Sequence, residues 1–143
     1  MGSNEERMNN LILEIRMLEN TFEELSARQG YFERALMENR TALETIKSLE
    51  TAGKDEVLLP IGGGVLLRSS PPSSEKVLVN VGLNVVVEKS RASATQLIEK
   101  RANEYEQNVI SLNNQRSQVA ERLESDRALF NAMMSGQAPV PRR

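Results

Sequence analysis

Apolar residues recur at alternating spacings of three and four along the first third of the chain, from Met8 to Ile46. The alternation stays in phase over several heptads without a proline, which is typical of a coiled-coil helix. Ser3 stands three residues before Glu6, as in a capping box, and Gly53 suits a left-handed helix end. We therefore predict a helix of about 45 residues, or roughly 70 Å at the helical rise. Its seam positions are Met8, Leu11, Ile15, Leu18, Phe22, Leu25, Gln29, Phe32, Leu36, Asn39, Leu43 and Ile46.

The last third of the chain carries a second pattern of the same period. Either Ser90 or Ser93 can cap its start, the latter with Gln96 completing a capping box, and Gly136 can end it. Because the connecting segment folds back, we expect the two helices to pair antiparallel, each covering the apolar stripe of the other. The seam positions are Ile98, Ala102, Tyr105, Val109, Leu112, Arg116, Val119, Leu123, Asp126, Phe130 and Met133.

Two polar seam residues and one glycine stand out in the first helical pattern. Gln29 and Asn39 occupy seam positions, where polar residues more often fix the register than bind a ligand. Gly30 should cost about 1 kcal/mol relative to alanine inside a helix. It is either a tolerated weak spot on the exposed face or a flex point with a function, and we favour the weak spot.

Between the helical patterns lie four short runs of branched aliphatic residues, separated by glycine, proline, asparagine and serine. Segment 60–64 splits the first pair of runs and segment 80–84 splits the second. Both segments contain residues that accept the positive φ of a tight turn. Pro71 and Pro72, in the break between the pairs, can neither continue a strand ladder nor donate to one. We predict two β-hairpins joined by a loop.

The predicted strands have little sequence around them that could cover their edges. Since an isolated hairpin is only marginally stable in water, we expect these strands to pair with strands of other chains. The residues predicted to carry this assembly, called the strand set below, are Val57, Leu58, Leu59, Val65, Leu66, Leu67, Val77, Leu78, Val79, Val85, Val86 and Val87.

Composition disfavours several classes of function. The chain has 143 residues, 3% aromatics and no Trp, so a compact core would be thin. Its net charge of −2 provides no general attraction to nucleic acid or to an anionic membrane. No apolar run approaches the roughly 20 residues of a membrane span, and the N-terminus has no signal-peptide core. With no cysteine either, we expect a chain that works in the cytoplasm.

Catalysis, metal binding and cofactor binding have little support in the sequence. The chain lacks His and Cys, which often serve as general bases and transition-metal ligands. Gly62, Gly63 and Gly64 precede a predicted strand rather than a helix, and no Lys-Ser/Thr pair follows them, so they do not match a phosphate loop. A pair of helices offers no water-excluding pocket for catalytic carboxylates. We predict no catalytic residue, no metal site and no cofactor.

The two chain ends should meet at one tip of the helix pair, and this tip holds more apolar residues than a seam requires. Five of the six methionines fall in these terminal portions, and flexible thioethers suit a surface that accepts many shapes. The tip is either a frayed end with an ordinary seam or a promiscuous apolar binding surface, and we favour the binding surface. The residues of this terminal cluster are Met8, Leu11, Ile12, Met17, Leu129, Phe130, Met133 and Met134.

Two stretches around the hairpins carry specific motifs, LPIGGGV at 59–65 and VNVGLNVVVEKS at 79–90, followed by Ala94 and LIEKR at 97–101. On these residues the chain resembles the prefoldin alpha-subunit family. Two hairpins rather than one favour the alpha class over the beta class. Asn84 stands where the family usually has a second glycine, and asparagine also accepts a left-handed conformation. The resemblance covers nearly the whole chain by architecture and about 59–101 by motif.

The predicted fold is α+β but mainly α, a long antiparallel coiled-coil helical hairpin with two central β-hairpins. The resemblance implies that these hairpins assemble into an oligomeric β-barrel. We predict a first helix in 1–53, the hairpins in 54–89, a second helix in 90–136 and a disordered tail in 137–143.

The resemblance also implies a function. Prefoldins are hexamers of two alpha and four beta subunits that capture unfolded proteins at coiled-coil tips without ATP and pass them to a group II chaperonin. The implied partners are beta subunits, unfolded client proteins and a chaperonin, with no nucleic acid and no membrane. The alternative is a structural filament-forming or scaffold coiled coil. A polar, sealed tip would favour this alternative, whereas the tip of this chain is apolar.

Overall fold

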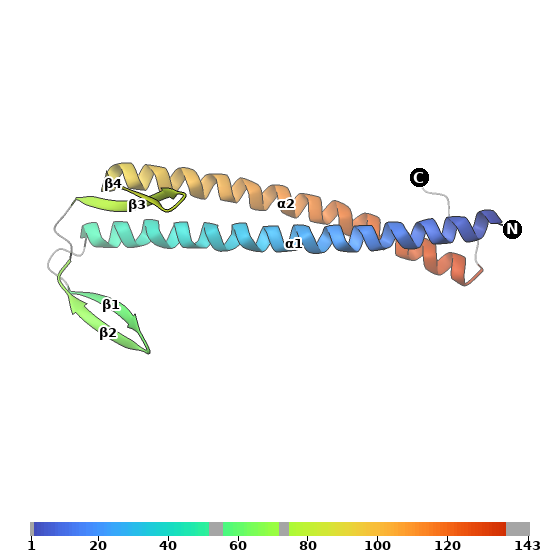
Figure 1. Ribbon diagram of the computed structural model, residues 1–143, viewed down its shortest axis with the longest axis horizontal. Helices are drawn as coiled ribbons and strands as arrows, with labels where there is room; N and C mark the ends of the chain where they lie inside the picture. Colours follow the sequence, from blue (N-terminus) through green and yellow to red (C-terminus); the bar gives the residue numbers. More distant parts are fainter. Residues whose placement is uncertain (1, 52–55, 72–74, 137–143) are drawn as a thin grey trace. The chain divides into compact units, whose positions relative to one another are not determined.

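The computed structural model describes residues 2–51, 56–71 and 75–136 (Figure 1). Its elements in chain order are α1 (Gly2–Thr51), β1 (Val57–Gly62), β2 (Val65–Ser69), β3 (Lys76–Gly82), β4 (Val85–Ser90) and α2 (Arg91–Met134). The predicted order of helix, two hairpins and helix is confirmed. The expected helix end at Gly53 and the predicted tail 137–143 lie outside the described residues.

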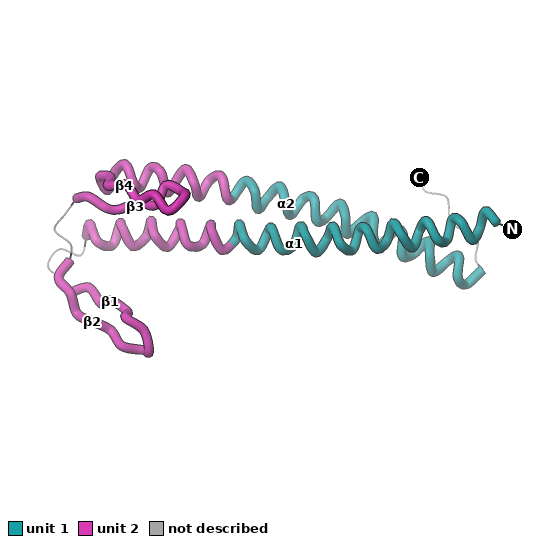
Figure 2. Tube along the Cα trace, viewed as in Figure 1, with its two compact units in different colours: residues 1–33, 106–143 teal, residues 34–105 magenta. Residues whose placement is uncertain are grey.

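The chain divides into two compact units, which Figure 2 shows in different colours. The first unit contains residues 1–33 and 106–143, and the second contains 34–105. The first unit is therefore built from the terminal portions of both helices. The second unit holds the remaining portions of the helices together with all four strands.

The predicted seam positions are buried or half-buried in both units. Leu11, Leu25 and Leu123 are among the most buried apolar side chains of the first unit, and Leu36 and Ala102 among those of the second. The 3-4 pattern thus marks the packing face of each helix. Gly30 is half-buried rather than exposed as expected, and α1 continues through it without a break.

Side-chain and backbone caps define the ends of α2. The Ser93 N–H donates to Ser90 Oγ at 3.1 Å, so Ser90 rather than Ser93 is the N-cap. The Arg91 N–H donates to the Glu75 carbonyl at 2.7 Å, which joins the helix start to the start of β3. At the other end Gly136 has a φ of +71°, as expected for the residue that closes the helix.

The strands form two antiparallel hairpins, β1 with β2 and β3 with β4. Each ladder contains one register shift just before its turn, between Pro60 and Gly62 in the first hairpin and between Asn80 and Gly82 in the second. In the second hairpin the Gly82 N–H donates to Asn80 Oδ1 at 2.9 Å, which supports the irregular backbone locally.

Both turns consist of two residues with positive φ, as in type I′ turns. Gly63 and Gly64 have φ values of +56° and +76°, and Leu83 and Asn84 have values of +50° and +59°. The left-handed conformation at Asn84 agrees with the sequence prediction. Leu83 was not predicted to adopt it, because a leucine pays the steric cost that glycine and asparagine largely avoid.

Candidate binding surfaces

The second hairpin packs one face against the helices of its own unit. Val79 is 8% exposed, and Val77 and Val87 on the same face are half-buried. Val77 and Val79 of β3 line a cavity of about 570 Å³ with Ala42, Ile46 and Ile98 of the helices. The Arg101 Nη2 donates to the Asn80 carbonyl at 3.0 Å and ties α2 to β3.

The opposite face of the second hairpin meets solvent. Leu78 is 74% exposed and Val86 is 54% exposed. Polar residues Lys76, Asn80 and Glu88 alternate with them in the two strands. This hairpin has the usual pattern of an antiparallel sheet, in which one face packs against the rest of the unit and the other meets solvent.

The first hairpin exposes apolar side chains on both faces. Leu59 lies opposite Leu67 in the ladder and Pro60 lies opposite Leu66. Successive pairs point to opposite faces, so each face carries apolar groups. Leu59, Leu66 and Leu67 are 46%, 54% and 51% exposed, and of the apolar residues in these two strands only Val57 is half-buried. Strands that are apolar on both faces are typical of sheets covered on both sides, so this hairpin has the composition of a buried element.

The strand set therefore falls into two groups. Val77, Val79 and Val87 are covered within their own unit, and the covered position of Val79 leaves it little surface for another chain. The remaining members stay accessible, apart from the half-buried Val57. They are Leu58, Leu59, Val65, Leu66, Leu67, Leu78, Val85 and Val86.

In the first unit, half of the terminal cluster lines one groove of about 540 Å³, called the terminal groove below. Its apolar residues are Met8, Leu11, Leu129 and Met133, and its polar residues are Asn4, Glu5, Arg7, Asn10 and Glu14, with Gly136 at one end. Leu11 forms the buried part of this surface, whereas the other three apolar residues are half-buried. The groove offers apolar contact with flexible thioethers in its wall.

The other members of the terminal cluster lie outside the terminal groove. Ile12 and Phe130 are half-buried, whereas Met17 is 70% exposed and Met134 is 64% exposed. Leu13 is 57% exposed and was not included in the predicted site, although it stands beside Leu11 and Ile12 in the sequence. Its position off the seam was the signal that would have identified it, because an off-seam leucine must face solvent or a partner.

Charged residues connect the helices of the first unit near the terminal groove. Arg122 donates to Glu14 Oε1 through Nη2 at 2.6 Å and through Nε at 3.0 Å. Its Nε also lies 3.3 Å from Asp126 Oδ1, and the Asp126 side chain has no exposed surface. The hydrogen bond with Glu14, followed by the charge of Asp126, raises the pKa of the Arg122 guanidinium above its ordinary value.

A second polar layer contains the predicted register residue Gln29. Arg116 Nη1 donates to Gln29 Oε1 at 2.9 Å, and Gln29 Nε2 donates to Glu33 Oε1 at 3.0 Å. The Arg116 guanidinium also lies over the Phe22 ring at 5.0 Å from its centre. These contacts pair specific residues across the two helices, as expected for a polar seam position that fixes the register. Asn39 instead donates to the Ala35 carbonyl of its own helix at 2.7 Å.

Within the described ranges, no group of three or more acidic side chains is placed to hold a metal ion. Neither α1 nor α2 contains an apolar stretch long enough to cross a membrane.

Comparison with known proteins gives consistent results. Residues 14–133 match the family model described as prefoldin subunit. The chain is 34% identical over 140 residues to a prefoldin subunit alpha of Nitrosopumilus maritimus, covering 94% of this chain and 97% of that protein. It is 36% identical over 118 residues to a prefoldin subunit alpha of Methanoregula boonei, covering 78% and 74%. The structure is similar to a chain of a filamentous prefoldin from Methanocaldococcus jannaschii, with a TM-score of 0.65, 26% identity and coverage of 80% and 96%.

Proposed function

The chain belongs to the prefoldin family, whose subunits are components of a chaperone, and on this premise we propose that it is an alpha subunit that holds unfolded proteins. In this proposal two such chains and four beta subunits form a cytoplasmic hexamer. The hexamer captures unfolded clients at its coiled-coil tips and delivers them to a group II chaperonin. The subunit itself catalyses no reaction.

The accessible apolar side chains of the two hairpins support the assembly step. The first hairpin presents apolar groups on both faces, and the second presents Leu78 and Val86 on one face. Burying a leucine or valine side chain contributes about 1.5–3 kcal/mol, so several such residues can offset the entropy lost on association. The proposed partners of these strands are the strands of neighbouring prefoldin subunits.

The observation that carries the client-holding step is the exposure of Met17 and Met134, which belong to the same unit as the terminal groove. An unfolded client exposes apolar side chains without fixed geometry. Flexible thioethers can adapt to such groups, and each contact remains weak enough to release. Several subunits acting together would supply avidity. Because apolar burial drives this binding, it should need no ATP and should be only weakly sensitive to salt.

The test is suppression of the aggregation of a chemically unfolded model protein by the reconstituted complex, followed by light scattering with and without ATP. The test variant is Met17→Gln with Met134→Gln, which should reduce holding several-fold while leaving the complex intact. The matched control is Met37→Gln with Ile110→Gln, because these residues are 69% and 50% exposed but lie outside the terminal cluster. The beta subunits used should have their own tips trimmed so that they cannot compensate.

Two results would contradict the proposal. One is a strict requirement for ATP by the purified complex. The other is full holding activity in the Met17 and Met134 variant with trimmed beta subunits, which would place client binding elsewhere on the chain.

The second candidate function is a structural filament, and the similarity to a chain of a filamentous prefoldin favours it. The same accessible strands would then join copies of this chain without beta subunits. Mass measurement of the purified chain alone separates the two functions. A filament would show masses that grow with concentration, whereas an alpha subunit would form the closed complex only after beta subunits are added.

A further inference from the structure

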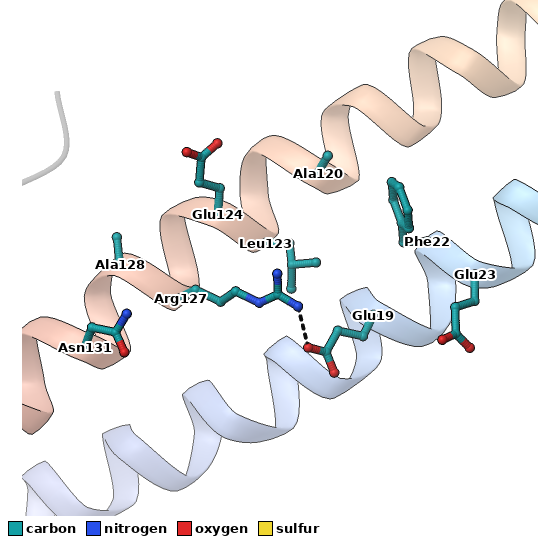
Figure 3. Close-up of a pocket in the computed structure, with 9 residues that line it drawn as sticks. All are labelled: Glu19, Phe22, Glu23, Ala120, Leu123, Glu124, Arg127, Ala128 and Asn131. Atoms are coloured by element: carbon teal, nitrogen blue, oxygen red, sulfur yellow. Dashed lines mark hydrogen bonds and ion pairs between the residues drawn. The ribbon is translucent and has the colours of Figure 1, made fainter.

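A second groove lies along the first unit and is lined by residues other than those of the terminal cluster, and Figure 3 shows its lining. Its volume is about 810 Å³, which is within the range of protein binding sites. It is called the lateral groove below. Its lining residues are Glu19, Phe22 and Glu23 of α1, with Ala120, Leu123, Glu124, Arg127, Ala128 and Asn131 of α2.

The floor of the lateral groove is apolar. Phe22 and Leu123 lie between the two helices in Figure 3, with Leu123 8% exposed and Phe22 half-buried. Ala120 and Ala128 are exposed and end at the β-carbon, so they leave space above this floor. An apolar side chain of a partner can therefore contact the accessible part of Phe22, next to the Arg116 guanidinium that lies over its ring.

Three carboxylates and one guanidinium line the lateral groove. Arg127 Nη2 donates to Glu19 Oε1 at 2.7 Å, so these two charges neutralise each other. Glu23 and Glu124 are exposed, and within the described part of the chain neither has a cationic partner. In Figure 3 one of them projects from each helix, and both point away from the space between the helices. The apolar floor is thus flanked by an unpaired carboxylate on either side.

We propose that the lateral groove binds a segment of another protein in which an apolar anchor is flanked by lysine or arginine. The anchor would cover Phe22 and Leu123, and the basic side chains would meet Glu23 and Glu124. An acidic segment of the same apolar content would instead place like charges together. The net charge of the chain is only −2, so the preference must come from the local arrangement rather than from general attraction. This proposal depends neither on the terminal cluster nor on client holding.

The test uses the full-length chain and two fluorescein-labelled peptides. In one peptide leucines are flanked by lysines, and in its twin glutamates replace the lysines. Fluorescence anisotropy gives the dissociation constants at low and high salt. We expect the lysine peptide to bind more tightly, with a preference that weakens as salt screens the exposed charges.

Neutralising variants locate the charge preference. Glu23→Gln with Glu124→Gln should weaken binding of the lysine peptide about 2- to 10-fold, since exposed ion pairs are individually modest. The control is Glu44→Gln with Glu99→Gln, which removes the same charge from exposed positions on the same two helices outside the lateral groove. This control should leave the dissociation constant unchanged.

A filling variant locates the apolar contact. Ala120→Gln adds an uncharged side chain at an exposed helical position that glutamine tolerates well, so circular dichroism should show an intact helix. It should weaken binding of the lysine peptide several-fold. Equal affinity for the two peptides would overturn the proposal, and so would an equal effect of the control variants.

Client holding measured in parallel separates the two proposals. A variant that loses peptide binding but retains holding would show that the lateral groove and the terminal cluster act independently. A wild-type complex that binds the lysine peptide but never suppresses aggregation would overturn the chaperone proposal and leave the groove proposal standing.

Discussion

The two hairpins share one backbone design but differ in what covers their side chains. Both have the same strand pairing, a register shift before the turn and a two-residue turn with positive φ. Val79 of the second hairpin is 8% exposed, whereas Leu59 and Leu67 of the first are 46% and 51% exposed. Local turn chemistry therefore specifies the hairpin, and the alternation of apolar and polar residues specifies which face is covered.

This difference separates two roles within the strand set. The second hairpin packs its Val79 face within its own unit and leaves Leu78 and Val86 accessible. The first hairpin has apolar residues at nearly every position and leaves both faces accessible. Its sequence is typical of a central strand pair that is covered on both faces, which is the basis of the proposed assembly through this hairpin.

The largest expected effect comes from placing lysines on the first hairpin. Leu59→Lys with Leu67→Lys should abolish assembly with beta subunits, because ammonium groups cannot be buried between strands without a partner. The isolated chain should keep its helical ellipticity and its free energy of unfolding, since these side chains are already about half exposed. Light scattering coupled to size exclusion measures the assembly, and circular dichroism measures the fold.

The matched change on the second hairpin should act on the chain itself. Val79→Lys buries an unpaired charge against the helices and should lower the free energy of unfolding by about 3 kcal/mol or more. Urea denaturation of the isolated chain measures this loss. If Leu59→Lys with Leu67→Lys lowered the free energy of unfolding as much as Val79→Lys, the first hairpin would also pack within its own chain. The contrast between the hairpins would then be wrong.

A smaller effect is expected from exchanging the turn residues. Gly63→Leu should destabilise the chain by about 1–2 kcal/mol, because a left-handed leucine is strained. The cost is conformational rather than steric, since a β-carbon at Gly63 meets nothing within 4 Å. Leu83→Gly should relieve the same strain, offset in part by the greater freedom of glycine in the unfolded chain. Urea denaturation should therefore show a clear loss for the first variant and a small gain for the second.

The helices and hairpins could be predicted from sequence because their signals are local. The 3-4 spacing identified the packing face of each helix, and glycine with asparagine identified the turns. The choice between Ser90 and Ser93 as N-cap required the structure, because both serines precede helical sequence and only geometry shows which oxygen accepts the backbone N–H. Leu83 was missed because leucine ordinarily avoids positive φ.

The contacts between distant segments could not be predicted in the same way. The pairs Arg122 with Glu14 and Arg127 with Glu19 depend on the register between the two helices, which the seam pattern alone leaves undetermined. The lateral groove depends on the same register, because its floor combines Phe22 of one helix with Leu123 of the other. The burial of Val79 likewise could not be predicted, because it depends on which helical residues lie opposite the strand.

The smallest expected effect concerns the arginine contacts of the two hairpins. Arg101 Nη2 donates to the Asn80 carbonyl at 3.0 Å and joins the second hairpin to α2, so Arg101→Met should lower the free energy of unfolding by about 1 kcal/mol. Arg68 Nε lies 3.8 Å from Glu56 Oε2 in the first hairpin, and these side chains are 79% and 63% exposed. Arg68→Met should therefore change stability by less than about 0.5 kcal/mol, because exposed ion pairs contribute little. Urea denaturation of the isolated chain can resolve the difference. A loss at Arg68 as large as that at Arg101 would mean that the first hairpin, like the second, is stabilised within its own chain.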